Sequence, residues 1–253
     1  MLYFIGAGSG DPELLTIKGK RIIDNSDVII YTGSLVNNEL FTDIKTDAKL
    51  INSASLSLDE VLEIILNSSE KGLNIARVHT GDPSMYGAIR EQMVALDKAG
   101  IEYEVIPGVS SVFAGAAALK REFTLPGVTQ TLILTRMAGR TPVPEAESIE
   151  NLAKIQSSMA IFLSIAGIEE LANKLMTSYP KDTPAAVVYK ASWPDQKIIM
   201  STLENIAGEV KSADINKTAL VYVGRFLADE FELSKLYDKN FSHEFREAKD
   251  AWR

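Results

Sequence analysis

Apolar and polar positions alternate along the first half of the chain in the way that is typical of an α/β protein. Short apolar runs at 2–5, 27–31, 49–51, 74–78 and 102–106 predict strands, and the amphipathic segments between them predict helices at 13–23, 58–67, 88–98 and 110–119. The segment 58–67 has the clearest helical pattern, and Ser57 precedes it as a capping residue. Because strands alternate with helices, we expect a mainly parallel sheet.

The second half repeats this organisation after a segment that contains proline and glycine, 121–128 (REFTLPGV). Apolar runs predict strands at 131–135, 159–163, 185–189, 198–200 and 219–223, with helices at 148–156, 168–178 and 203–211. We therefore expect two α/β domains, 1–120 and 129–253, joined by 121–128 as a linker. The polar segment 238–253 is expected to form a C-terminal helix or an extension that docks on a partner.

Composition and charge fit a globular protein and narrow the possible partners. The 253 residues are 46% hydrophobic and 24% charged, and no apolar run approaches the roughly 20 residues that a membrane-spanning helix needs. The N-terminus lacks the basic start and cleavage site of a signal peptide, so a cytoplasmic location is expected. A net charge of −8 disfavours nucleic acid as a partner, because phosphate backbones require a basic face.

The chain has no cysteine and only two histidines, His79 and His243. Disulfides, thiolate nucleophiles and cysteine-ligated metals are excluded, and we expect no metal site. His79 follows a predicted strand, where a buried histidine with a backbone partner is more common than a catalytic base. Spacing alone therefore assigns no catalytic residue.

The most informative turn is 80–85 (TGDPSM), between the strand at 74–78 and the following helix. Gly81 can take a positive φ, and Pro83 fixes its own φ while moving Asp82 away from the helical region. Asp82 can therefore cap the turn that follows. Open α/β sheets bind ligands at the carboxyl ends of their strands, so this turn is either a capped connection or part of a site.

A glycine-rich turn at 6–11 (GAGSGD) follows the first predicted strand and invites comparison with a dinucleotide fingerprint. That fingerprint requires G-x-G-x-x-G and an acidic residue at the end of the next strand. Here the third glycine comes one position early, and the second strand ends in Tyr31 and Thr32 without an acidic residue. The dinucleotide interpretation fails on both points, which leaves a tight strand-to-helix turn.

Two further loops carry polar side chains that could serve a ligand or only the fold. In 107–111 (PGVSS), Ser110 and Ser111 can cap the next helix or hold a ligand group at its N-terminus. In 135–145 (TRMAGRTPVPE), Arg136 and Arg140 stand in a proline-stiffened loop. This arrangement suits the binding of carboxylates, and a solvated loop with surface ion pairs is the alternative.

Taken together, these turns resemble those of the tetrapyrrole methylases, the S-adenosylmethionine-dependent enzymes of the cobalamin, sirohaem and related pathways. The resemblance covers essentially the whole chain and rests on 6–16 (GAGSGDPELLT), 81–87 (GDPSMYG), 107–111 (PGVSS) and 221–225 (VYVGR). Residues 31–36 (YTGSLV) and 134–145 (LTRMAGRTPVPE) are similar to the branch that methylates C-11 of precorrin-4 or its cobalt form. The uroporphyrinogen-III branch has an aspartate near Thr32, and the family usually has proline at the position of Ser9.

The resemblance implies two α/β domains with S-adenosyl-L-methionine in the cleft between them, an acidic tetrapyrrole substrate and a homodimer. The implied cofactor contacts are Thr80, Gly81, Asp82, Met85, Ser110, Ser111, Leu163, Ser164 and Ala191. The implied substrate contacts are Gly8, Gly10, Asp11, Arg136 and Arg140. Because a sulfonium methyl is already an activated electrophile, orientation can supply much of the acceleration without a protein nucleophile.

Two alternatives stay open at this point. Other members of the family would act on ribosomal RNA or diphthine, although the low pI of about 5.0 and the arginine loop count against RNA. A non-catalytic tetrapyrrole-binding protein would share the same turns, because binding and catalysis use them alike. Transfer of a labelled methyl group separates an enzyme from a carrier.

Overall fold

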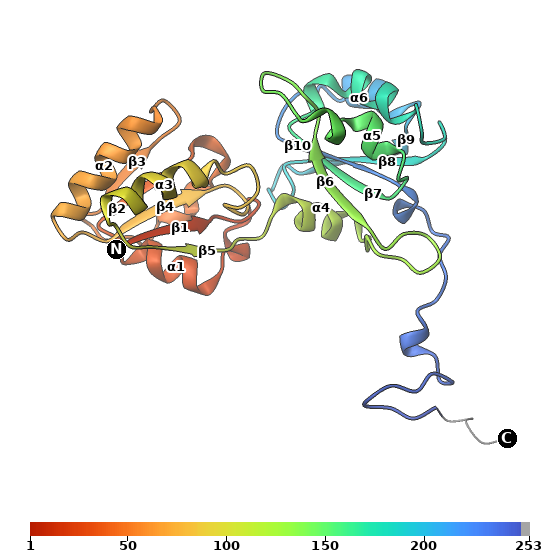
Figure 1. Cartoon of the computed structure of the whole chain (residues 1–253), viewed down its shortest axis with the longest axis horizontal. Coiled ribbons are helices and arrows are strands. Elements are labelled where there is room, and N and C mark those ends of the chain that lie inside the picture. Colours follow the sequence, from red (N-terminus) through yellow and green to blue (C-terminus); the bar gives the residue numbers. More distant parts are fainter. Residues whose placement is uncertain (249–253) are drawn as a thin grey trace. The chain divides into compact units, whose positions relative to one another are not determined.

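The computed structural model describes residues 1–248, and its chain divides into two compact units (Figure 1). The first unit consists of Met1–Gly115 together with Lys190–Gln196, a segment that comes from the second half of the sequence. The second unit contains Ala116–Tyr189 and the chain from Lys197 onward. The linker at 121–128 stays a prediction. None of the described helices has the length and apolar character that crossing a membrane requires.

The first unit is built on a five-stranded parallel sheet, as the alternation of elements predicts. Its strands lie in the order β3-β2-β4-β1-β5. Their bounds are Leu2–Gly6 (β1), Val28–Tyr31 (β2), Lys49–Asn52 (β3), Ile75–His79 (β4) and Tyr103–Ile106 (β5). All five carboxyl ends therefore lie along one edge of the sheet, where the loops that follow them come together.

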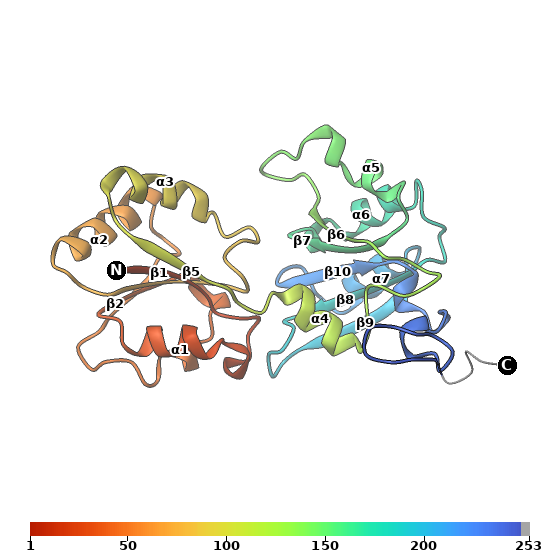
Figure 2. The ribbon, with the colours of Figure 1, turned by 60° about the horizontal axis from the view of Figure 1, so that its bottom comes forward.

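Helices cover both faces of this sheet (Figure 2). The helices are α1 (Ile17–Asp24), α2 (Leu58–Glu70) and α3 (Ile89–Ala99). Alternate strand residues face opposite sides, so Ile29 packs with α1 whereas Ile30 packs with α2 and α3. Ser57 caps α2 in a capping box with Glu60, which confirms the predicted start.

The helix predicted at 13–23 is shorter than expected because two different caps divide its first part. The Asp11 side chain accepts a hydrogen bond from the Glu13 amide, and a 3₁₀ turn, η1, occupies Pro12–Leu14. Thr16 then caps α1 by accepting a hydrogen bond from the Gly19 amide at 3.1 Å. The apolar pattern alone could not separate a 3₁₀ turn from the helix that follows it.

The second unit contains a mixed five-stranded sheet in the order β6-β7-β10-β8-β9. Its strands are Leu132–Arg136 (β6), Ser158–Phe162 (β7), Pro184–Tyr189 (β8), Lys197–Thr202 (β9) and Ala219–Val223 (β10). Only β6 and β7 are parallel, whereas β10 pairs antiparallel with both β7 and β8. Helices α5 (Ile149–Ala153), α6 (Ile168–Leu175) and α7 (Ile206–Ser212) share one core with this sheet. Helix α4, Ser111–Leu119, spans the boundary between the units.

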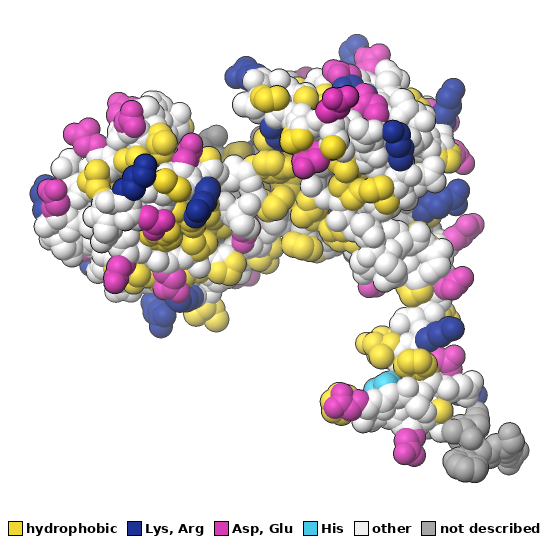
Figure 3. Space-filling model, in the orientation of Figure 1, with side chains coloured by type: hydrophobic (Ala, Val, Ile, Leu, Met, Phe, Trp, Pro, Cys, Tyr) yellow, Lys and Arg dark blue, Asp and Glu magenta, His cyan; other side chains and the backbone are white. Residues whose placement is uncertain are grey.

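Up to residue 248, where the described part ends, the C-terminal tail does not form the α-helix that was one expectation for 238–253. The described part has a short 3₁₀ turn, η7 (Lys235–Tyr237), followed by a loop in which Arg246 donates hydrogen bonds to the carbonyls of Leu236, Asp238 and Phe241. Several hydrophobic side chains of this tail are exposed (Figure 3). The predicted range 249–253 lies outside the described residues.

Candidate functional site

Three predicted turns meet at the carboxyl edge of the first sheet. The amide of Ala7, after β1, donates to the carbonyl of His79 at 2.7 Å, and Gly8 and Gly81 exchange two backbone hydrogen bonds of 3.2 and 2.8 Å. The Gly108 amide, after β5, donates to Oδ2 of Asp82 at 2.9 Å. The structure thus brings the turns at 6–11, 80–85 and 107–111 into one connected group.

Glycine is required where these turns touch. A Cβ atom on Gly108 would lie 2.2 Å from the carbonyl oxygen of Gly81, and one on Gly6 would lie 2.6 Å from Cα of Gly108. Both distances are far below van der Waals contact, and the obstructing atoms belong to the backbone. The sequence pattern identified the glycine turns but not this mutual contact.

Asp82 acts as the capping residue that its position before Pro83 predicts. Its Oδ1 accepts hydrogen bonds from the amide and hydroxyl of Ser84, while Oδ2 accepts the Gly108 amide. Burial opposes ionisation of this carboxyl, but the hydrogen bonds from Ser84 and Gly108 outweigh it and lower the pKa of Asp82 below its ordinary value. The side chain therefore stays charged and joins the loops after β4 and β5.

The other predicted cofactor residues of the first unit lie along the same loops. Ser110 is buried, and its hydroxyl accepts a hydrogen bond from the Val112 amide at 3.4 Å, next to the start of α4 at Ser111. Thr80 and Met85 are half-buried in the loop after β4. In the same loop Tyr86 has a φ of +57°, a conformation that is costly for a bulky side chain. The loop is thus held in an unusual backbone shape beside Asp82.

Residues 190–196 close over the glycine-rich turn. Trp193 donates its indole N–H to the carbonyl of Ser9 at 2.9 Å, and Ser192 bonds to the Ser9 hydroxyl at 2.8 Å and to the Asp11 amide at 3.0 Å. A Cβ atom on Gly10 would lie 2.0 Å from Nε1 of Trp193. Gly10 and Asp11, predicted as substrate contacts, are therefore held by protein groups on this side, and the predicted contact Ala191 is buried at the start of the segment.

In the second unit, the predicted residues Leu163 and Ser164 come directly after β7. Ser164 is buried, and its hydroxyl donates to the carbonyl of Phe162 at 2.7 Å and accepts the amide of Met137 at 2.9 Å. Leu163 has a φ of +54° and is 74% exposed, so this strand end presents an apolar side chain to solvent from a strained backbone. Such strain is concentrated at ligand sites.

Arg136 and Arg140 occupy the loop after β6, and the structure gives them different surroundings. The Arg136 guanidinium donates to the carbonyls of Met137, Thr141 and Pro142 at 3.3, 3.2 and 2.8 Å, so it shapes its own loop. Arg140 is exposed. A role of either arginine in substrate binding stays a prediction.

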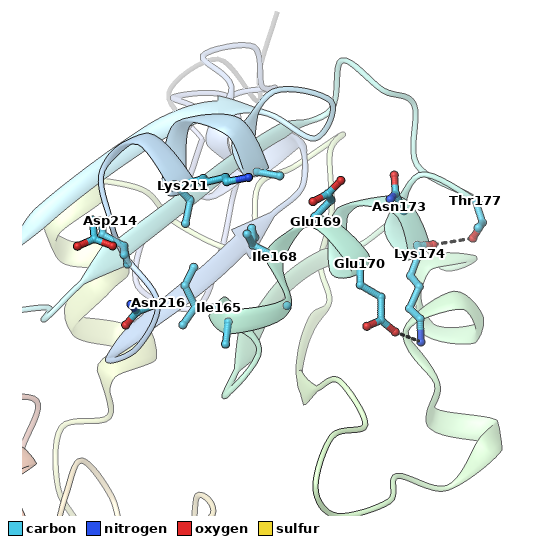
Figure 4. Close-up of a pocket in the computed structure, with 15 residues that line it drawn as sticks. Ile165, Ile168, Glu169, Glu170, Asn173, Lys174, Thr177, Lys211, Asp214 and Asn216 are labelled. Carbon is cyan, nitrogen blue, oxygen red and sulfur yellow. Dashed lines mark hydrogen bonds and ion pairs between the residues drawn. The ribbon is translucent and has the colours of Figure 1, made fainter.

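The second unit also contains a groove of about 870 Å³ between α6 and α7 (Figure 4). Its apolar base includes Ile168, Val210 and Ile215, and charged side chains such as Glu170, with its ion pair to Lys174, line its rim. None of the residues predicted as cofactor or substrate contacts lines this groove.

His79, at the end of β4, is 2% exposed, and its Nε2 has no hydrogen-bonding partner among the described residues. The expected backbone partner is therefore missing at this atom. Burial, with a smaller effect from the positive charge of Arg77, lowers the pKa of His79 from 6.5 to about 3. The imidazole is neutral at physiological pH and is a weak base.

This depressed pKa predicts a loss of stability in mild acid. Between pH 6.5 and about 3, the unfolded chain binds a proton at residue 79 and the folded chain does not. The free energy of unfolding should therefore fall by up to about 1.4 kcal/mol for each unit by which the pH is lowered in this range. Urea unfolding of the wild type and of His79→Leu between pH 4.5 and 7 measures this slope. The variant should have a markedly flatter slope, and His243→Gln, in the tail, should retain the wild-type slope. Equal slopes in all three proteins would contradict the prediction.

Two side chains of this edge were not identified from the sequence. Trp193 is separated from Ser9 by 184 positions, and no local pattern connects them. Arg77 did give a signal, because a charged residue inside the apolar run 74–78 must find polar partners when the strand is buried. Its partners are Gln92, Ser53 and the carbonyl of Ile30.

Comparison with known proteins identifies the family. Residues 1–207 match the family model of the tetrapyrrole (corrin/porphyrin) methylases, and the chain belongs to this family. It is 52% identical over 246 residues to the cobalt-precorrin-4 C(11)-methyltransferase of Methanocaldococcus jannaschii, which covers 96% of this chain and 95% of that protein. Identity to the precorrin-4 C(11)-methyltransferase of Pseudomonas aeruginosa is 45%, over 97% of this chain and 98% of that protein.

A solved structure gives the same result for the fold. The X-ray structure of CbiF, a cobalt precorrin-4 methyltransferase, is 44% identical in sequence and superposes with a TM-score of 0.88. The match covers 89% of this chain and 95% of that one. The α/β fold of two sheets is therefore confirmed, and so is the family predicted from the turns.

Proposed function

We propose that the protein is an S-adenosyl-L-methionine-dependent methyltransferase that adds a methyl group to C-11 of cobalt-precorrin-4 or precorrin-4. The observation that carries this proposal is similarity over nearly the full length to enzymes that are named for this reaction, at 52% and 45% identity. A biosynthetic role in cobalamin formation follows from the substrate.

The residues at the carboxyl edge of the first sheet fit such a methyl donor. Asp82 offers a charged, half-buried carboxylate to hydroxyl or ammonium groups, and Met85 offers an apolar contact in the same loop. When bound, the donor supplies an activated sulfonium methyl group. The task of the protein residues is then to bind and orient, which can contribute up to roughly 7–11 kcal/mol. The hydrogen-bonded loops around Asp82 have the stiffness that orientation requires.

The remaining contacts are assigned from the family resemblance. Thr80, Gly81, Ser110 and Ser111 would contribute to the cofactor site from the first unit, together with Ala191. Leu163 and Ser164 would contribute from the strand end of the second unit. Gly8, Gly10, Asp11, Arg136 and Arg140 would contact the acidic tetrapyrrole. A homodimer belongs to this proposal on the resemblance alone, and a cytoplasmic location stays an expectation from the sequence.

The direct test is methyl transfer. The protein is incubated with methyl-labelled S-adenosyl-L-methionine and precorrin-4, with and without cobalt in the macrocycle, and the label and the product mass are followed. We expect the label in the tetrapyrrole, with a mass gain of one CH₂ unit and the new methyl group at C-11. Uroporphyrinogen III serves as the control substrate and should acquire no label.

Each other outcome has a definite meaning. Binding of donor and tetrapyrrole without transfer would favour a carrier, and label on a different carbon would assign the protein to another branch of the family. A clear preference between the two forms of precorrin-4 would identify the natural substrate.

A further inference from the structure

The first unit contains a buried guanidinium that has no counter-ion among the residues the structure describes. Arg77 lies within β4 and is 6% exposed. Its Nε donates to Oε1 of Gln92 at 3.2 Å, and its Nη1 donates to the Ser53 hydroxyl at 2.9 Å and to the carbonyl of Ile30 at 3.3 Å. All three acceptors are neutral, and among the described residues no carboxylate lies within 4.0 Å of the guanidinium.

This arrangement leaves a charge that protein groups do not balance. Burial lowers the pKa of Arg77 to about 10, so the side chain still carries its charge at neutral pH. A buried charge is costly unless an opposite charge or a full set of hydrogen bonds compensates it. The second amino group of the guanidinium, Nη2, has no acceptor among the described residues. Its N–H groups are therefore available as hydrogen-bond donors.

Arg77 lines a pocket of about 290 Å³ near the carboxyl ends of β2, β3 and β4. Buried Ser53, Arg77 and Gln92 line its inner part, and exposed Ala88 and Glu91 line its rim. All the lining residues belong to the first unit. The pocket therefore offers a cation at its base and access from solvent at its rim.

A second unused polar group lines the same pocket. The Thr32 hydroxyl oxygen is buried and has no hydrogen-bonding partner among the described residues. Ile30 is the register partner of Arg77, and Thr32 lies two positions further along the chain, just after the end of β2. A cation with a free N–H and a hydroxyl without a partner are complementary to the two oxygens of a carboxylate.

We propose that this pocket binds a carboxylate group, with Arg77 as its counter-ion and Thr32 as a hydrogen-bond donor. A monoanion fits better than a phosphate dianion, because the site has one buried cation and Glu91 adds a negative charge at the rim. The carboxylate belongs either to a free short-chain acid or to an acetate or propionate chain of the tetrapyrrole. The assignment to a side chain of the tetrapyrrole rests on the proposed function.

Binding of two probes tests this site in the full-length protein. Propionate represents the free acid, and uroporphyrin III represents a tetrapyrrole with carboxylate chains, with its octamethyl ester as the uncharged control. Isothermal titration and thermal unfolding are measured at neutral pH and constant ionic strength. We expect saturable binding of at least one carboxylate probe, a higher melting temperature in its presence, and no effect of the ester.

Thr32→Val is the decisive variant because it separates a binding role from a structural one. Removal of a buried hydroxyl that has no partner should keep or raise the melting temperature without ligand, and should weaken binding of the probe roughly tenfold or more. Thr42→Val, which removes a hydroxyl outside the pocket, should bind like the wild type. Arg77→Gln, if folded by circular dichroism, should lose the probe-induced shift altogether.

The outcomes decide whether the pocket binds a carboxylate and which molecule carries that carboxylate. Binding of propionate identifies a site for free acids, whereas binding of uroporphyrin alone assigns the pocket to a side chain of the tetrapyrrole. Equal affinity in the wild type and Thr32→Val, or binding of neither probe, would overturn the proposal. Methyl transfer by the wild type is measured separately, so a failure of this pocket is distinguishable from a failure of the proposed reaction.

Discussion

Substitution of Gly108 by alanine should lower the free energy of unfolding by about 3 kcal/mol or more and abolish methyl transfer. The added Cβ would lie 2.2 Å from the carbonyl oxygen of Gly81 and 2.7 Å from Cα of Gly6. Because these are backbone atoms, no rotamer change can relieve the contact, and the ends of β1, β4 and β5 must separate. Urea unfolding and the labelled methyl-transfer assay measure the two effects.

A matched glycine gives the control. For Gly208, inside α7, no described atom other than its chain neighbours and the backbone of its own helix lies within 4 Å of the position that a Cβ would occupy. Gly208→Ala should therefore raise stability by up to about 1 kcal/mol, since alanine favours the helix. Wild-type stability in Gly108→Ala would show that the three loops can move apart freely. The hydrogen-bonded turns at 6–11, 80–85 and 107–111 would then not form a rigid part of the site.

Asp82→Ala should reduce methyl transfer about a hundredfold, because the loss of one contact can misplace reacting groups by an ångström. The substitution removes the acceptor for the Gly108 amide and for both Ser84 donors, and leaves a partly buried N–H without a partner. We also expect a stability loss of about 1–3 kcal/mol. Rates at saturating donor, donor affinity by calorimetry and urea unfolding are measured on the same preparations.

Ser84→Ala is the control for this substitution. It removes only the hydroxyl contact and leaves both backbone amides bonded to Asp82, so most of the activity and stability should remain. Loss of donor binding in a folded Asp82→Ala protein supports a cofactor site. Loss of stability with unchanged donor affinity would reduce Asp82 to a capping residue.

Local chemistry was predictable from the sequence wherever the determining residues are close along the chain. The cap of α2 at Ser57 and the turn at Asp82 involve contacts over two or three positions, and both are present. The strands of both sheets were found from their short apolar runs, although Arg77 interrupts the run of β4 and no residue of the edge strands β3 and β9 is buried. The length of the helix predicted at 13–23 was overestimated because the side-chain caps of Asp11 and Thr16, which compete locally with helix, set the actual bounds. Helix α5 starts after its Ser148 cap but ends at Ala153, before Gln156 takes a φ of +54°.

Contacts between distant segments could not be predicted in this way. The crowding of Gly6 against Gly108 depends on strand order, and the bond from Trp193 to Ser9 depends on a segment that returns to the first unit. Arg136 shows a different limit. Two arginines in a loop that also contains two prolines predict fixed cations, but the sequence does not tell whether a guanidinium binds a ligand or the carbonyls of its own loop.

The return of residues 190–196 to the first unit has a consequence for biosynthesis. The last strand of the parallel sheet, β5, ends at Ile106. Ser192 and Trp193, which bond to Ser9 and Asp11, are translated more than 80 residues later. At about 5–20 residues per second, the ribosome exposes an open glycine turn for several seconds or more. A nascent chain that stops after β8 would carry a folded sheet whose glycine turn lacks its covering segment.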